Sequence, residues 1–164
     1  MNKTLVVYGS TTGSCEDYAK RIAERLHAEV MNISDVDADK FSEYDNLILG
    51  TSTWGAGELQ DDWYDGLETL KSANLSGKTI ALFGCGDAEG YSDTFCGAMA
   101  EIYNAIKDCG VILIGSVDAS SYSYDDSEAV VDGKFVGLAI DVAESDSQTN
   151  ERISKWVEEI KTSL

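Results

Sequence analysis

Short apolar runs alternate with segments of helical periodicity along the whole chain. Several of the runs are continuously apolar, which is typical of strands buried on both faces. They predict strands over Thr4–Tyr8, Glu29–Ile33, Leu47–Gly50, Thr79–Phe83 and Val111–Ile114. Strands interleaved with helices favour a mainly parallel sheet with helices on both faces.

The segments between the runs place apolar side chains three or four residues apart, as an amphipathic helix does. The apolar faces of the four expected helices consist of Tyr18, Ile22, Ala23 and Leu26; of Trp63, Leu67 and Leu70; of Phe95, Ala98, Met99, Ile102 and Ile106; and of Ile153, Trp156, Val157, Ile160 and Leu164. No repeat or linker divides the 164 residues. We therefore expect a single domain over residues 1–164.

A long polar segment interrupts the end of this pattern. After Ile114 the chain reads GSVDASSYSYDDSEAVVDGK, and a second apolar run follows at Phe135–Ile140. The Asp-Gly pair at 132–133 is typical of a tight turn. The simplest interpretation is a last strand split by an excursion of roughly 20 residues, a length that is often functional in loops.

The composition is strongly acidic, with 12 Lys and Arg against 30 Asp and Glu and a net charge of −18. This charge disfavours nucleic acid and anionic membranes as partners. It favours a dissociable partner with a basic face, although solubility alone is an alternative explanation. Since no apolar run approaches the ~20 residues of a spanning helix and no signal peptide is visible, we expect a cytoplasmic protein.

The cysteines do not form a metal-binding pattern. Cys15, Cys85, Cys96 and Cys109 are scattered without a CxxC pair, and His27 is the one histidine of the chain. Zinc and iron–sulfur sites require paired spacings of such ligands. We therefore expect free thiols and no metal.

The stretch GSTTGSC at residues 9–15 lies between the first predicted strand and the first helix. A helix N-terminus offers unpaired backbone N–H groups and the positive end of its dipole, which together suit a phosphate. The hydroxyl groups of the stretch add donors. The alternative is an ordinary strand–helix turn capped by Ser and Thr. Neither GxxxxGK[ST] nor GxGxxG is present in this stretch, so it is not one of the common nucleotide-binding loops.

Two further loops are expected to meet this turn, because ligands of a doubly wound sheet bind beyond the carboxyl ends of its strands. GTSTWGAGELQDDW follows the third strand and GCGDAEGYSDTF the fourth. Trp54 and Tyr91 lie in these polar loops, where a core residue would be poorly placed. They suggest a sandwich around a flat ring, unless each one covers the edge of the core.

The motifs STTGS, TWGAGELQDDW and GCGDAEGYSDTF together resemble the flavodoxin family, in order and spacing and over essentially the whole chain. The excursion followed by GKFVGLAID is similar to the long-chain subgroup, in which an insertion splits the last strand. The resemblance implies an α/β, three-layer doubly wound sandwich. Its five-stranded parallel sheet would have the strand order 2-1-3-4-5, which periodicity alone does not show.

The resemblance also implies non-covalent binding of FMN. The residues that would cradle its phosphate are Ser10, Thr11, Thr12, Gly13, Ser14 and Cys15. Trp54 and Tyr91 would flank the isoalloxazine, with Tyr91 the more nearly coplanar. Further contacts with the cofactor are expected from Ser52, Thr53, Gly55, Ala56, Gly57, Cys85, Gly86, Asp87, Phe95 and Cys96. Cys15 stands where the family usually has Thr, and a thiol is a weaker donor to a phosphate.

The function implied by the resemblance is that of a low-potential one-electron carrier in place of a ferredoxin, and not of an enzyme. The carrier would shuttle between the neutral semiquinone and the anionic hydroquinone of FMN. Surrounding negative charge and an aromatic sandwich destabilise that hydroquinone. The Gly55–Ala56 peptide would tune the semiquinone by turning its carbonyl toward the flavin N5, because Gly tolerates both orientations.

The expected partners are redox proteins with basic docking faces, such as a ferredoxin/flavodoxin-NADP reductase or low-potential oxidoreductases, and the carrier is expected to be a monomer. One alternative is an FMN-dependent NAD(P)H or quinone reductase, for which the sequence offers no basic patch. Another is a phosphoacceptor signalling domain. Gly9-Ser10, Gly50-Thr51 and Gly115-Ser116 stand where that class needs acidic residues and a Lys.

Overall fold

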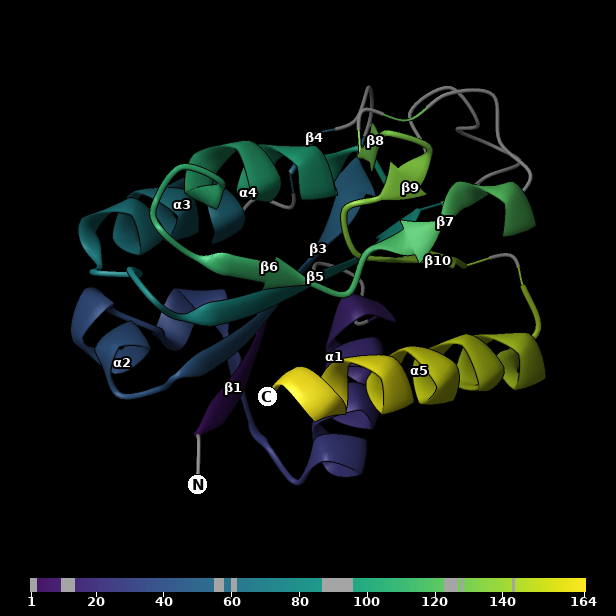
Figure 1. The fold of residues 1–164 in the computed structure, drawn as a ribbon, viewed down its shortest axis with the longest axis horizontal. Coiled ribbons are helices and arrows are strands. Elements are labelled where there is room, and N and C mark those ends of the chain that lie inside the picture. Colours follow the sequence, from purple (N-terminus) through teal and green to yellow (C-terminus); the bar gives the residue numbers. More distant parts are fainter. Residues whose placement is uncertain are drawn as a thin grey trace.

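The computed structural model describes residues 3–9, 14–54, 58–59, 62–86, 96–122, 127, 129–142 and 144–164. Its elements are β1 (Thr4–Gly9), α1 (Ser14–Leu26), β2 (Glu29–Asn32), η1 (Ile33–Asp35), α2 (Ala38–Ser42), β3 (Asn46–Trp54), β4 (Glu58–Leu59), α3 (Asp62–Ser72), β5 (Thr79–Gly86), α4 (Ala98–Ile106), β6 (Ile112–Ile114), β7 (Val117–Asp118), η2 (Ala119–Ser121), β8 (Val130–Val131), β9 (Lys134–Phe135), β10 (Leu138–Asp141), α5 (Asp146–Ile160) and η3 (Lys161–Ser163). Figure 1 shows their arrangement around one central sheet.

The main sheet has the order β2-β1-β3-β5-β10, and all of these neighbours run parallel. Counted as five strand positions, this is the predicted order 2-1-3-4-5. The chain begins in the middle of the sheet, moves out to β2, and returns across β1 to the other side. The ends of β1 and β3 therefore lie at the switch point, where a doubly wound sheet binds its ligand.

Two short strands share the fifth position, which confirms that the last strand is split. β6 pairs with the first half of β5, with Ile80 opposite Leu113. β10 pairs with the second half, with Cys85 opposite Ile140. The chain leaves the sheet after β6 and re-enters it at β10.

The excursion between them contains a small antiparallel sheet of order β7-β9-β8. The turn between β8 and β9 is the predicted Asp-Gly pair, in which φ is 54° at Asp132 and 80° at Gly133. Positive φ at both central residues defines the type I′ turn that two-residue hairpins favour. Phe135 of β9 is fully buried and meets the Tyr122 ring edge-on, with 4.9 Å between the ring centroids.

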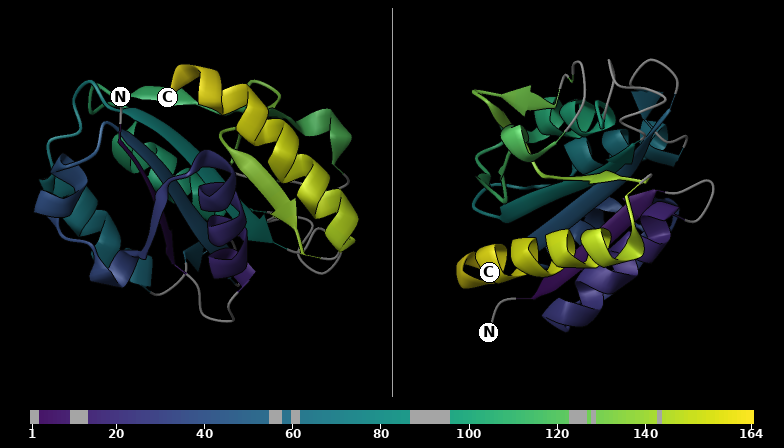
Figure 2. Two further views of the ribbon diagram at one scale, coloured as in Figure 1. Left: turned by 90° about the horizontal axis from the view of Figure 1, so that it is seen from below. Right: turned by 90° about the vertical axis from the view of Figure 1, so that its right-hand side faces the viewer.

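The helices cover both faces of the sheet, as expected (Figure 2). α1 and α5 lie together on one face, over Val6, Ile48 and Phe83. α3 and α4 cover the other face, over Val7 and Leu49, and the excursion extends the same layer. Within the described part of the chain, no helix is both long and apolar enough to cross a membrane.

The structure differs from the predicted elements at several places. Phe135–Ile140 is not one strand, because Phe135 belongs to the small sheet and the parallel strand begins at Leu138. The helix α2 was not predicted. It has five residues and buries only Phe41, so its sequence shows no apolar periodicity. The third helix begins at Ala98, and the predicted Phe95 lies outside the described residues.

Candidate functional site

The carboxyl ends of the central strands meet at one edge of the sheet. Gly9 of β1 lies opposite Thr51 of β3, and Ser52 lies opposite Cys85 of β5. Asp141 of β10 pairs with Gly86 and extends the edge to the fifth position. This edge is where topology predicts the ligand site.

Several predicted site residues are placed at this edge. Ser14 and Cys15 begin α1, and Ser52, Thr53 and Trp54 end β3. Cys85 and Gly86 end β5, and Cys96 lies just before α4. The other predicted residues lie outside the described part of the chain: Ser10, Thr11, Thr12, Gly13, Gly55, Ala56, Gly57, Asp87, Tyr91 and Phe95.

The first turn of α1 combines backbone donors with acidic side chains. Its first N–H groups have no partner within the helix, as at every helix N-terminus. Glu16 accepts a hydrogen bond of 2.9 Å from the Tyr8 hydroxyl and forms an ion pair of 3.3 Å with Lys20. The Tyr8 hydroxyl, followed by Lys20, lowers the pKa of the Glu16 carboxyl. Burial and then Glu16 raise the pKa of Tyr8 to about 12.

Three thiols lie beneath this edge, and burial keeps two of them, Cys15 and Cys96, neutral. Cys15 is fully buried among α1, β1 and β5. Its hydrogen bond with the Cys85 thiol, together with burial, raises the pKa of Cys15 well above the ordinary value. Burial does the same to the pKa of Cys96, whose Sγ donates to the carbonyls of Gly84 and Ile140 at 3.7 Å each. Neutral thiols add neither a cation nor an anion to the site.

Trp63 of α3 is hydrogen-bonded to the middle of β3. Its side chain is fully buried, and the indole N–H donates to the Gly50 carbonyl at 2.7 Å. On the opposite face of the sheet, the Phe83 ring occupies the space where a side chain at Gly50 would point. The sequence predicted Trp63 as one of several core residues of a helix. Its hydrogen bond to Gly50, which lies four residues before Trp54 in β3, was not predicted, because no local sequence pattern indicates it.

A cavity of about 480 Å³ lies elsewhere, between the excursion and α5. Lys134 and Lys155 face it from opposite walls, as do the acidic residues Asp118 and Glu159. Arg152 also lines it and forms two contacts of 2.8 Å with Glu144. No predicted site residue lines this cavity, and its charges are nearly balanced.

The fold is that of a doubly wound α/β protein in which the carboxyl ends of β1, β3 and β5 meet at one edge of the sheet. The family model described as flavodoxin matches residues 6–156. The chain is 40% identical to a flavodoxin of Helicobacter pylori, over 100% of this chain and 99% of the relative. It is also 40% identical to flavodoxin 1 of Azotobacter vinelandii, over 96% of this chain and 94% of that protein. The chain belongs to the flavodoxin family.

Solved structures agree with this family membership. The crystal structure of Fusobacterium nucleatum flavodoxin bound to flavin mononucleotide matches with a TM-score of 0.92 and 27% sequence identity. The match covers 100% of this chain and 99% of that one. Oxidised flavodoxin 2 of Bacillus cereus matches with a TM-score of 0.78, also at 27% identity, over 99% of both chains.

Proposed function

We propose that this protein binds FMN non-covalently at the carboxyl edge of its sheet and carries single electrons between redox enzymes at low potential. The observation that carries the proposal is the placement of the α1 N-terminus beside the ends of β3 and β5. The Fusobacterium nucleatum flavodoxin bound to flavin mononucleotide shares this fold with a TM-score of 0.92.

The donors at the edge suit a phosphate that is held without a cation. α1 begins directly after the hydroxyl-rich residues 10–13, and its first N–H groups are available to an anion. The Cys15 side chain is fully buried in the core, so backbone N–H groups and the preceding hydroxyls would hold the phosphate. Trp54 and Tyr91 would flank the ring, and the Gly55–Ala56 peptide would contact its edge.

FMN, when bound, supplies a centre that accepts and releases one electron at a time. The chain contributes a strongly negative field, since its net charge is −18. Negative surroundings disfavour a further negative charge on the ring. The same field would keep the second reduction at low potential.

The partners we propose are redox proteins that present a basic face, such as a ferredoxin/flavodoxin-NADP reductase. Complementary charge speeds the encounter of such partners. We also propose that the chain acts as a monomeric single domain in the cytoplasm. Four free cysteines are typical of a reducing compartment.

Reconstitution with FMN followed by reductive titration tests the proposal. We expect the protein to bind FMN stoichiometrically and the titration to resolve into two separate one-electron steps. Failure to bind FMN would refute the proposal. Steady oxidation of NAD(P)H by the purified protein alone would instead favour an FMN-dependent NAD(P)H or quinone reductase.

A further inference from the structure

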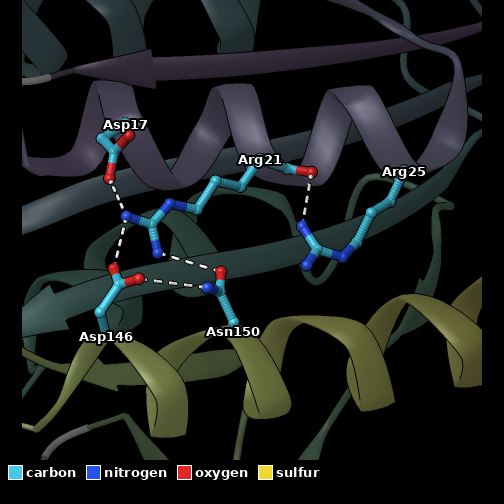
Figure 3. Close-up of polar contacts among 5 residues, drawn as sticks. All are labelled: Asp17, Arg21, Arg25, Asp146 and Asn150. Carbon is cyan, nitrogen blue, oxygen red and sulfur yellow. Dashed lines mark hydrogen bonds and ion pairs between the residues drawn. The ribbon is translucent and has the colours of Figure 1, made fainter.

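Arg21 joins α1 to α5 through a cluster of charged and polar groups (Figure 3). Its Nη2 lies 2.7 Å from Asp17 Oδ2 and 2.8 Å from Asp146 Oδ1. Its Nη1 donates to Asn150 Oδ1 at 3.1 Å, and the Asn150 amide donates to Asp146 at 3.3 Å. One guanidinium thus binds a carboxylate from each of the two helices.

Both carboxylates lie close to the edge where the ligand is expected. Asp17 belongs to the first turn of α1, the turn that would receive the phosphate. Asp146 is the first residue of α5, a few residues after β10 ends at that edge. A helix rises about 1.5 Å per residue, so Asp17 is about 4.5 Å along the axis from Ser14. This is well within the Debye length of about 10 Å at 0.1 M salt.

An acidic residue in the first turn of a helix competes with a bound phosphate for the positive end of the dipole. Glu16 is offset by Lys20 and by the Tyr8 hydroxyl. Arg21 is the cation that offsets Asp17 and Asp146. Burial alone would lower the pKa of the Arg21 guanidinium. The hydrogen bond to Asp146 and the charge of Asp17 outweigh burial and raise that pKa.

We propose that Arg21 is a positioning residue for FMN: its single positive charge offsets one of the two negative charges of Asp17 and Asp146, and the cation-free first turn of α1 can then accept the dianionic phosphate. The inference rests on the proposed function and deepens it. A purely structural role, in which Arg21 only joins two helices, is the competing explanation. The two explanations differ for riboflavin, which has the same ring as FMN and no phosphate.

The test compares dissociation constants for FMN and riboflavin in Arg21→Met, measured by quenching of flavin fluorescence. At 0.1 M salt we expect the FMN Kd to rise about fivefold, the scale of an uncompensated charge near a helix N-terminus. The riboflavin Kd should stay unchanged. At 1 M salt the difference for FMN should disappear, because the Debye length falls to about 3 Å.

Matched variants separate charge from packing. Arg25→Met removes a cation one turn farther along α1, where Arg25 donates to Ser154 Oγ at 3.0 Å and to the Arg21 carbonyl at 3.3 Å. We expect it to leave the FMN Kd nearly unchanged. Arg21→Lys should keep most of the affinity. Adding Asp17→Asn and Asp146→Asn to Arg21→Met should restore the FMN Kd.

Equal weakening of FMN and riboflavin in Arg21→Met would overturn the inference, and so would an unchanged FMN Kd. If that variant does not fold, Asp146→Asn replaces it in the test. Removal of this carboxylate should lower the FMN Kd, and an unchanged or higher Kd would contradict the inference. If the wild-type protein binds neither flavin, the proposed function fails. Inorganic phosphate then tests Arg21 separately, since equal stabilisation of wild type and Arg21→Met by phosphate would overturn its role.

Discussion

At the scale of single residues, two tryptophans serve as polar anchors on opposite faces of the sheet. Trp63 donates its indole N–H to the Gly50 carbonyl at 2.7 Å, and Trp156 donates to the Gly115 carbonyl at 2.8 Å. Both rings are almost completely buried. A buried polar group that loses its partner costs about 1–3 kcal/mol. Each hydrogen bond therefore helps to fix the position of its helix against the sheet.

Replacement of Trp63 by Phe should affect both stability and the ligand site. The variant keeps most of the ring but leaves the Gly50 carbonyl without its donor. We expect about 1–2 kcal/mol less stability of the apoprotein in urea unfolding. We also expect weaker FMN binding, because Gly50 is four residues from the end of β3 at Trp54.

Trp156→Phe is the matched control for this prediction. It breaks an equivalent bond at Gly115, where the excursion begins after the outer strand β6 and not on the central strand β3. We expect a similar loss of stability and an unchanged FMN Kd. A loss of FMN affinity as large as that of Trp63→Phe would contradict the idea that Trp63 acts through the end of β3.

At the scale of elements, continuous apolar runs identified the central strands because these are buried on both faces, whereas the outer strands β2 and β6 are only partly buried. The split of the last strand also followed from sequence, since polar residues separate two apolar runs. The small sheet of β7, β8 and β9 could not be predicted, because each strand has two residues and pairs across the excursion. The Asp132–Gly133 turn could be predicted, because the preference for such a turn is a property of the Asp-Gly pair itself.

The return of the chain to the sheet depends on Gly137. A Cβ at this position would overlap the carbonyl oxygen of Leu82 on β5, so only Gly allows β10 to approach its neighbour. We expect Gly137→Ala to lose about 3 kcal/mol of stability, at the upper end of overpacking changes, since the obstacle is backbone. Denaturant unfolding of the apoprotein measures this loss.

Gly133→Ala is the matched control within the same excursion. Gly133 has φ of 80° and nothing within 4 Å of an added Cβ, so backbone strain alone opposes the change. We expect it to cost about 1 kcal/mol. If Gly137→Ala costs no more than Gly133→Ala, close approach to β5 is not what requires glycine at position 137.

At the scale of the whole molecule, the sequence indicates which edge of the sheet is expected to bind the ligand, but not the charge balance around that edge. The strand order implied by the family resemblance is confirmed, and it places the ends of β1, β3 and β5 at one edge of the sheet. The spacing of Asp17 and Arg21, four positions apart, suggests a pair on one helix. The bond from Arg21 to Asp146 spans 125 positions, and no local pattern indicates it.

The net charge of −18 leads to a prediction about partners. If the acidic surface steers basic redox proteins, the second-order rate of electron transfer to a basic reductase should fall about tenfold between 0.1 M and 1 M salt, as the Debye length shrinks from about 10 to about 3 Å. Stopped-flow mixing of the reduced protein with the reductase measures this rate. Reoxidation by dioxygen, which is uncharged, is the control and should vary little with salt. A flat salt dependence with the reductase would show that the charge of the molecule does not guide its encounters, whatever its effect on the cofactor.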